Sequence, residues 1–233
     1  MGERPYERGR RLMAYIPYRR DPSVFRFPLP NRIWKHHLKY PDFSVLAYLH
    51  YRHHRELPGR ASVTELTGTL GLKPGAVRRI LDVLTRQGLV TPDLVPVVGR
   101  EKYFSLPDEV FYLNLGSAAI AVYAFLLYRE NRKTYQCTLS YKAIGYAIGA
   151  SNNTVRKYVL ELEAAGLIAT NRTMVLDANG KERNGSLRYT ILPVQNAMEL
   201  YHQRQLAALD AAAERQRVKK PLSASATKGG AAL

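Results

Sequence analysis

Residues 151–168 read SNNTVRKYVLELEAAGLI, and residues 73–90, which stand 78 positions earlier, read KPGAVRRILDVLTRQGLV. Both stretches place a valine and an arginine near the start and a glycine followed by a leucine near the end. Between these points the apolar residues recur at the spacing of a helix with one buried face, and glycine is a typical helix stop. The sequence therefore contains the same short amphipathic helix twice.

The repeat extends well beyond these two helices. At an offset of 78, residues 62–89 match residues 140–167, and at an offset of 77, residues 27–52 match residues 104–129. One insertion or deletion separates the two blocks, so two copies of a unit close to 78 residues fill the chain from 24 to 193. We expect a basic arm at 1–23, one copy of the unit in each of two domains at 24–102 and 103–193, a helix at 194–220 and a disordered tail at 221–233.

Copy two, residues 103–193, contains three expected helices. The first follows Ser117, a favourable N-cap, and buries a broad apolar face. The second begins at Ser140 and ends at Gly149, and the third runs from Ser151 to Gly166, so the two cross steeply after a short turn. The inward residues are expected to be Ile120, Tyr123, Ala124 and Leu127 in the first helix, Ala143, Ile144, Ala147 and Ile148 in the second, and Val155, Tyr158, Val159 and Leu162 in the third.

The segment after Gly166 changes to the alternation of strands. LIATNRTMV and SLRYTIL flank the turn-rich LDANGKERNG, which predicts a hairpin with a long basic tip. Copy one has a shorter version, GLVTPDLVPVVGREKYFSL, whose second strand is expected to run directly into copy two. This order of elements is that of the winged helix-turn-helix. We therefore predict a mostly α fold with small β-hairpin wings (α+β): two tandem winged helix-turn-helix domains plus a C-terminal helix.

Residues 103–191 resemble helix-turn-helix proteins of bacterial mobile elements and the N-terminal domains of plasmid replication initiators. The resemblance is carried by an aromatic-Phe-x-Leu-Pro opening, a helix that ends in Leu-Tyr-Arg, and a Glu-x-x-Gly-Leu-Ile exit. Copy one departs from this pattern, because it has Lys73-Pro74-Gly75-Ala76 where copy two has Ser151-Asn152-Asn153-Thr154. That departure weakens the case for base reading by copy one.

The composition points to a polyanionic partner. The 233 residues carry a formal charge of +16 and an isoelectric point near 10.0, which favours nucleic acid or an anionic membrane face. No apolar run is long enough for a membrane span or a signal peptide, and the single cysteine, Cys137, excludes an intramolecular disulfide. We therefore expect a cytoplasmic, nucleoid-associated protein that binds double-stranded DNA.

The third helix of copy two is expected to contact the bases, because arginine can bond both acceptors of guanine and asparagine the donor–acceptor edge of adenine. Its expected contact residues are Asn152, Asn153, Thr154, Arg156 and Lys157. Phosphate contacts are expected from Ser151, Tyr141 and Lys142, equivalent contacts in copy one from Lys73, Arg78 and Arg79, and wing contacts from Lys181, Arg183, Asn184 and Arg188.

Each basic segment also has a plainer interpretation. A charged helix face is often only solvated, but paired basic residues at the same helical position in both copies favour DNA contact. The arm carries Arg4, Arg8, Arg10, Arg11, Arg19 and Arg20, and either follows the phosphate backbone, enters a minor groove or serves as a solubilising tail. Structure-specific RNA binding is a further reading of the charge.

The histidines raise the question of a metal. His50, His53 and His54 have helical spacing, with His36 and His37 nearby. The aligned positions of copy two supply at best one ligand, so we expect no metal site and no cofactor. No His-x-His pair, phosphate-cradling glycine loop or serine-hydrolase motif occurs either, so we expect no enzyme, with a metal-dependent nicking enzyme as a distant alternative.

The function expected from these patterns is sequence-specific binding of double-stranded DNA, most simply for transcription control. The alternative is a replication initiator of a plasmid or mobile element that binds origin repeats. The C-terminal helix either packs against copy two or presents an irregular apolar stripe to a second copy or another partner; the stripe comprises Met198, Tyr201, Leu206 and Leu209.

Overall fold

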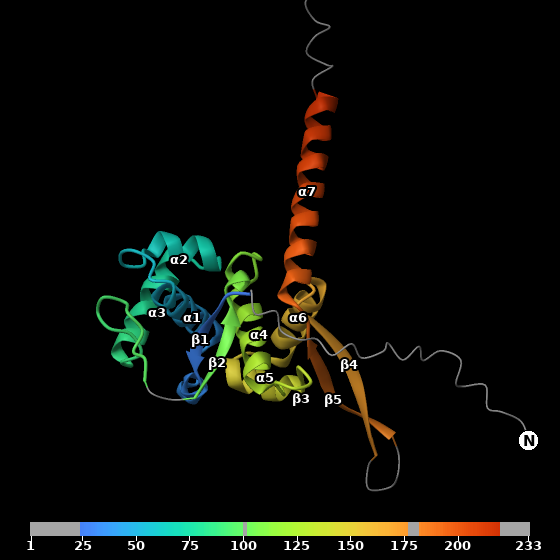
Figure 1. Ribbon diagram of the computed structural model, residues 1–233, viewed down its shortest axis with the longest axis horizontal. Helices are drawn as coiled ribbons and strands as arrows, with labels where there is room; N and C mark the ends of the chain where they lie inside the picture. Colours follow the sequence, from blue (N-terminus) through green and yellow to red (C-terminus); the bar gives the residue numbers. More distant parts are fainter. Residues whose placement is uncertain (1–23, 100–101, 177–181, 220–233) are drawn as a thin grey trace, which may run out of the picture.

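The computed structural model describes residues 24–99, 102–176 and 182–219 (Figure 1). The basic arm at 1–23 and the tail at 221–233 lie outside these residues. Copy one consists of strand β1 (Arg26–Pro30), the 3₁₀ helix η1 (Asn31–His36), and helices α1 (Tyr40–His54), α2 (Val63–Leu70) and α3 (Pro74–Arg86). Copy two consists of β2 (Tyr103–Pro107), η2 (Asp108–Phe111), α4 (Ser117–Arg129), β3 (Gln136–Leu139), α5 (Tyr141–Ile148), α6 (Asn152–Ala164), β4 (Ile168–Leu176) and β5 (Glu182–Ile191), and α7 (Val194–Lys219) follows. The fold is therefore of the expected α+β class, with helix-turn-helix units at α2–α3 and α5–α6.

The caps expected for the second and third helices of copy two are confirmed. The Ser140 hydroxyl accepts a hydrogen bond from the amide of Ala143 at 3.1 Å, and Ser151 accepts one from Thr154 at 3.2 Å. Gly149 ends α5 in the left-handed conformation, with φ of 64°. The expectation for Ser117 is wrong by one residue: Gly116 is the N-cap of α4, and its amide donates to a Glu161 carboxylate oxygen at 3.2 Å.

The buried faces of these helices match the expectation with one exception. Ala143 is exposed, whereas Gly145 is buried between α5 and α6. A Cβ at position 145 would lie 2.5 Å from the carbonyl oxygen of Ala150. Glycine at this position thus leaves room for the turn between α5 and α6, and the buried face of α5 passes through Gly145 rather than Ala143.

The two copies are related by an approximate two-fold axis at the β1–β2 sheet. These strands pair antiparallel, with Pro28 opposite Ser105, Phe27 opposite Leu106 and Leu29 opposite Phe104. In the repeat alignment Pro28 is equivalent to Ser105, so a residue faces its own counterpart at the centre of the sheet. Every other pair in the register is then exchanged by a half-turn about that point.

Aromatic side chains cross this axis reciprocally. Trp34 of η1 packs against Phe125 and Phe104 of copy two, with ring centroids 5.0 and 5.9 Å away. Its counterpart Phe111 of η2 packs against Tyr48 and Phe27 of copy one at 5.0 and 5.8 Å. Helix α4, which is buried over nearly its whole length, lies beside α1 in the centre of the molecule (Figure 1). The copies therefore share one hydrophobic core.

The hairpin expected in copy two is confirmed. β4 and β5 pair antiparallel and extend away from the core (Figure 1), and β3, which the sequence pattern did not predict, completes a sheet of order β3-β5-β4. The expected hairpin of copy one is wrong in its second strand. That strand, β2, pairs with β1 instead of with the strand before it, and this pairing buries Phe104 and Leu106 in the shared core. The hairpin of copy one is reduced to a bridge between Val90 and Pro96, beside a bond from the Val97 amide to the Leu89 carbonyl.

Helix α7 packs through its first turns only. Val194 and Ala197 are buried, Met198 and Tyr201 are half-buried, and the guanidinium of Arg204 donates to the carbonyl of Ala164. The side chains from 202 to 216 are exposed, and the helix projects alone from the body (Figure 1). Over the described part of the chain, no helix is both long and apolar enough to cross a membrane.

Candidate nucleic-acid interface

Helix α6 presents the side chains expected to contact bases. Asn152, Asn153, Arg156 and Lys157 are exposed. Val155, Val159 and Leu162, on the opposite face of the helix, are buried. The spacing of the buried residues fixes the rotation of the helix, so the polar set lies together on the first two turns. An exposed leucine, Leu160, continues this face toward the C-terminal end of α6.

The cations of this face have no carboxylate partner within the described residues. The ion pairs found there join Arg52 to Glu65 and Arg55 to Asp108. The acids of α6 itself point elsewhere, because Glu161 accepts from the Gly116 amide and Glu163 from the Thr170 amide at 3.0 Å. Arg156 is therefore available to an external anion or acceptor.

The start of α6 combines a capped terminus with free donors. The Ser151 hydroxyl accepts the Thr154 amide and lies 2.9 Å from the Thr154 hydroxyl. This leaves the earlier amides of the first turn without intrahelical partners, next to the positive end of the helix dipole. Such a terminus attracts an anion, although part of the Ser151 hydroxyl's capacity is used in capping.

Helix α5 supports this surface with a second set of side chains. Lys142 is exposed in its first turn, whereas Tyr141 is half-buried against the core and less available than expected. Tyr146 is 76% exposed, and its ring packs edge-on to His37 at 5.6 Å. Tyr146 was missed in the sequence, although the positions assigned inward in this helix leave it on the outer face.

The remaining wing residues are only partly placed. Arg188 is exposed on β5, where its backbone pairs with Thr138 and Asn171. Lys181 and the side chains of Arg183 and Asn184 lie outside the described residues. Arg188 is thus the expected wing contact whose side chain the structure places.

Helix α3 carries the corresponding surface of copy one. Lys73, Arg78 and Arg79 are exposed, but Arg79 donates to its own helix at the carbonyl of Gly75, 3.3 Å away. Pro74 opens the helix and Lys73 provides no side-chain cap. The surface is basic like that of α6 but lacks its asparagines.

The histidines of copy one differ in their exposure. His50 is buried, and desolvation, then the nearby His53 and Arg32, lower its pKa to about 4. His36, His37, His53 and His54 are exposed, and the described residues contain no group of three His, Cys, Asp or Glu side chains close enough to hold a metal ion. The thiol of Cys137 is buried, which raises its pKa to about 12.

Comparison with known proteins gives three results. A solved structure with the name "Possible transcriptional regulator from Methanosarcina mazei Go1" is similar over 53% of this chain and 96% of its own, with 16% sequence identity and a TM-score of 0.33. No curated protein matches the chain. A family model described as "Helix-turn-helix domain" matches residues 113–168, from the residues before α4 to the start of β4. The chain therefore contains a helix-turn-helix domain, which supports DNA binding.

Proposed function

We propose that the protein binds double-stranded DNA sequence-specifically through α6 and regulates transcription. The observation that carries this proposal is the uncompensated polar face on the first two turns of α6, inside the segment that matches the helix-turn-helix family. Placed in a major groove, Arg156 would bond guanine and Asn152 or Asn153 adenine, each pair contributing about 1–3 kcal/mol of discrimination.

The surrounding groups would position this helix. In that arrangement Lys142 and the capped start of α6 would contact the phosphates that flank the groove, and Arg188 would reach the backbone beside it. These contacts do not depend on the base sequence, and they make the affinity for DNA fall as the salt concentration rises. The formal charge of +16 also favours DNA as the partner.

Copy one would contribute orientation and weaker contacts. The approximate two-fold axis between Pro28 and Ser105 relates α3 to α6 by a half-turn. If both helices engage one duplex, their half-sites are inverted rather than directly repeated, and the half under α3 is the less specific. The favoured site is therefore an imperfect inverted repeat.

We propose a binding protein rather than an enzyme. Incubation of supercoiled plasmid with the protein and Mg²⁺ or Mn²⁺ should give no relaxed product. A nicked product that disappears with chelator would support the metal-dependent nicking alternative.

Affinity selection of sheared genomic DNA at about physiological salt tests the function directly. Recovery of a short inverted site overlapping a promoter supports a transcription regulator that acts in the cytoplasm on the chromosome. A cluster of direct repeats beside a replication gene would instead support the initiator of a plasmid or mobile element. Recovery without sequence preference, or stronger competition by duplex RNA, would refute sequence-specific DNA recognition by α6.

A further inference from the structure

Leu160 stands in the middle of the outer face of α6. Residues three and four apart share a face of a helix, so Leu160 lies one turn beyond both Arg156 and Lys157. All three side chains are exposed, and Leu160 is 54% exposed. The leucine is therefore surrounded by the side chains that we propose for base contact.

The packing of the fold does not account for this leucine. Val155 and Val159 of the same helix belong to the shared core, whereas, within the described residues, Leu160 is neither in that core nor among the half-buried residues packed against it. Single exposed apolar side chains are common, so exposure alone assigns no role. The position of Leu160 among groove-reading residues is what gives its exposure a meaning.

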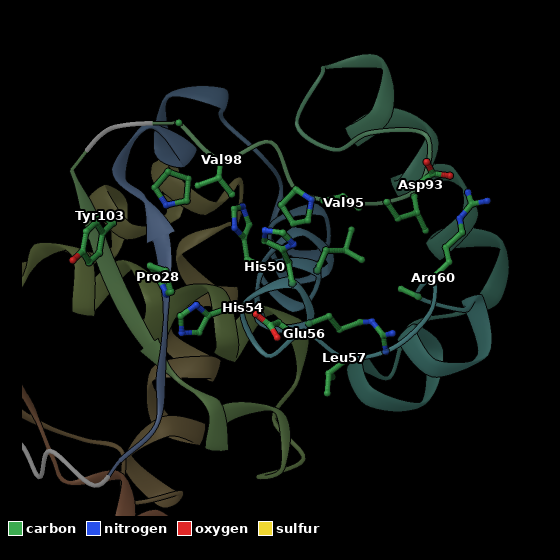
Figure 2. Close-up of a pocket in the computed structure, with 18 of the residues that line it drawn as sticks. Pro28, His50, His54, Glu56, Leu57, Arg60, Asp93, Val95, Val98 and Tyr103 are labelled. Carbon is green, nitrogen blue, oxygen red and sulfur yellow. The ribbon is translucent and has the colours of Figure 1, made fainter.

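A protein-docking patch is a poor explanation for this side chain. Such patches are contiguous, and the exposed Leu57, Val95 and Val98 of copy one show that grouping, because they lie around a single pocket (Figure 2). The residues one turn away from Leu160 on α6 are instead two cations, a glutamate and an alanine. A lone apolar side chain among charged ones matches a small apolar group better than it matches a protein surface.

The major groove offers such a group at one base. Each base pair there presents hydrogen-bond donors and acceptors, and thymine adds its C5 methyl group. The side chain of leucine has no polar atom and cannot bond those donors and acceptors, but it can cover the methyl group and exclude water from it. Thymine is therefore the base that gains from a leucine at this position.

Copy one lacks this feature. At the offset of 78, the counterpart of Leu160 is Asp82, which is exposed on α3. The phosphates repel a carboxylate, and at a base edge a carboxylate accepts from the amino group of cytosine. The half of the site under α3 should therefore show no dependence on a thymine methyl group at the equivalent base pair.

The helix geometry also limits where the thymine lies. Four residues rise about 6 Å along the axis of an α-helix, and successive base pairs are about 3.4 Å apart. The thymine under Leu160 should therefore lie within about two base pairs of the guanine under Arg156.

We propose that Leu160 is a specificity-determining residue that reads the C5 methyl group of a thymine in the major groove. This inference rests on the proposed function, because it requires α6 to lie in the groove. It adds an apolar contact to the polar ones: Arg156 selects a guanine, and Leu160 selects a thymine close to it. The half-site read by copy two thus contains both bases.

Fluorescence anisotropy of the full chain with the selected duplex tests the proposal. Each thymidine of the site is replaced in turn by deoxyuridine, which lacks only the C5 methyl group. At one thymine, this replacement should weaken wild-type binding about fourfold, which is the loss expected when one methyl group is no longer buried. Leu160→Ala should bind the thymine duplex more weakly than the wild type does, and it should bind the thymine and uracil duplexes equally well.

A matched control is available on α7. Leu206→Ala truncates a leucine that is 62% exposed and lies outside the helix-turn-helix, so it should keep the full difference between the thymine and uracil duplexes. A second measurement separates the methyl group from the hydrogen bonds of thymine. With a cytosine in place of that thymine, methylation of the cytosine at C5 should strengthen wild-type binding about fourfold and leave the binding of Leu160→Ala unchanged.

Failure of this inference differs from failure of the proposed function. Equal wild-type affinity for the selected and scrambled duplexes would overturn both. A preference for the selected duplex with no methyl effect near the base pair at which Arg156→Ala relaxes the preference would overturn the inference alone, and so would a methyl effect that persists in Leu160→Ala. Equal weakening of Leu160→Ala on the thymine, uracil and scrambled duplexes would also overturn it, because the leucine would then act through the fold of α6.

Discussion

Arg156 provides the sharpest test of the DNA-binding surface. Its side chain is exposed, has no carboxylate partner among the described residues, and lies on the second turn of α6. Loss of a bidentate contact to guanine removes about 1–3 kcal/mol of discrimination, which corresponds to a fall in specific affinity of about 5- to 150-fold. Arg156→Ala should cause this fall on the selected duplex and relax the preference at a single base pair. Because the side chain is exposed, thermal stability should change little.

The assay is anisotropy titration of the selected duplex, its single-base variants and a scrambled duplex at one fixed salt concentration. Arg215→Ala is the matched control, because it removes the same charge from the exposed part of α7. It should weaken binding slightly and equally on every duplex. Equal effects of the two substitutions, or retained preference at every base in Arg156→Ala, would refute the assignment of α6 as the recognition helix.

Three further outcomes follow from the structure. Lys142→Ala should weaken binding to selected and scrambled duplexes alike and reduce the slope of log affinity against log salt by about one, as measured by titration at several salt concentrations. Gly145→Ala should lower the free energy of unfolding by about 1–3 kcal/mol in urea titrations, because its Cβ would lie 2.5 Å from a carbonyl oxygen. The control Gly68→Ala, where nothing lies within 4 Å, should be neutral or stabilising, and equal losses would contradict the steric argument. Because the pKa of His50 is about 4 in the folded chain and about 6.5 when unfolded, the unfolded state binds more protons between these values. Acidification from pH 7 to 4 should therefore cost up to about 3 kcal/mol through this group, and His50→Leu should make urea-unfolding stability less pH-dependent; an unchanged profile would contradict the shift.

Local patterns in the sequence were sufficient for most of α5 and α6. Serine caps, glycine stops and apolar spacing gave the ends of both helices and placed Asn152, Asn153 and Arg156 on the outer face. Ala143 was assigned inward because alanine fits either environment, and the burial of Gly145 against the turn at Ala150 is a tertiary contact that the local pattern does not contain. The DNA contacts themselves remain predictions.

The long-range pairings were not available from local patterns. β2 follows a hairpin-like segment in the sequence, but pairing with β1 buries Phe104 and Leu106 in a core built by both copies. The reciprocal packing, in which Trp34 contacts copy two and Phe111 contacts copy one, likewise depends on the two-fold relation between the copies.

The reciprocal packing of Trp34 and Phe111 makes the molecule equivalent to a dimer within a single polypeptide. In a dimer of separate chains, half-saturation of DNA depends on the subunit dissociation constant, and a mutation in one subunit is repeated in the other. Here the linkage keeps the two halves at a high effective concentration at any dilution, so DNA binding should show no concentration-dependent assembly step. Each half is also free to change alone, which lets one half keep a recognition helix with asparagines while the helix of the other half starts with Lys73-Pro74-Gly75-Ala76.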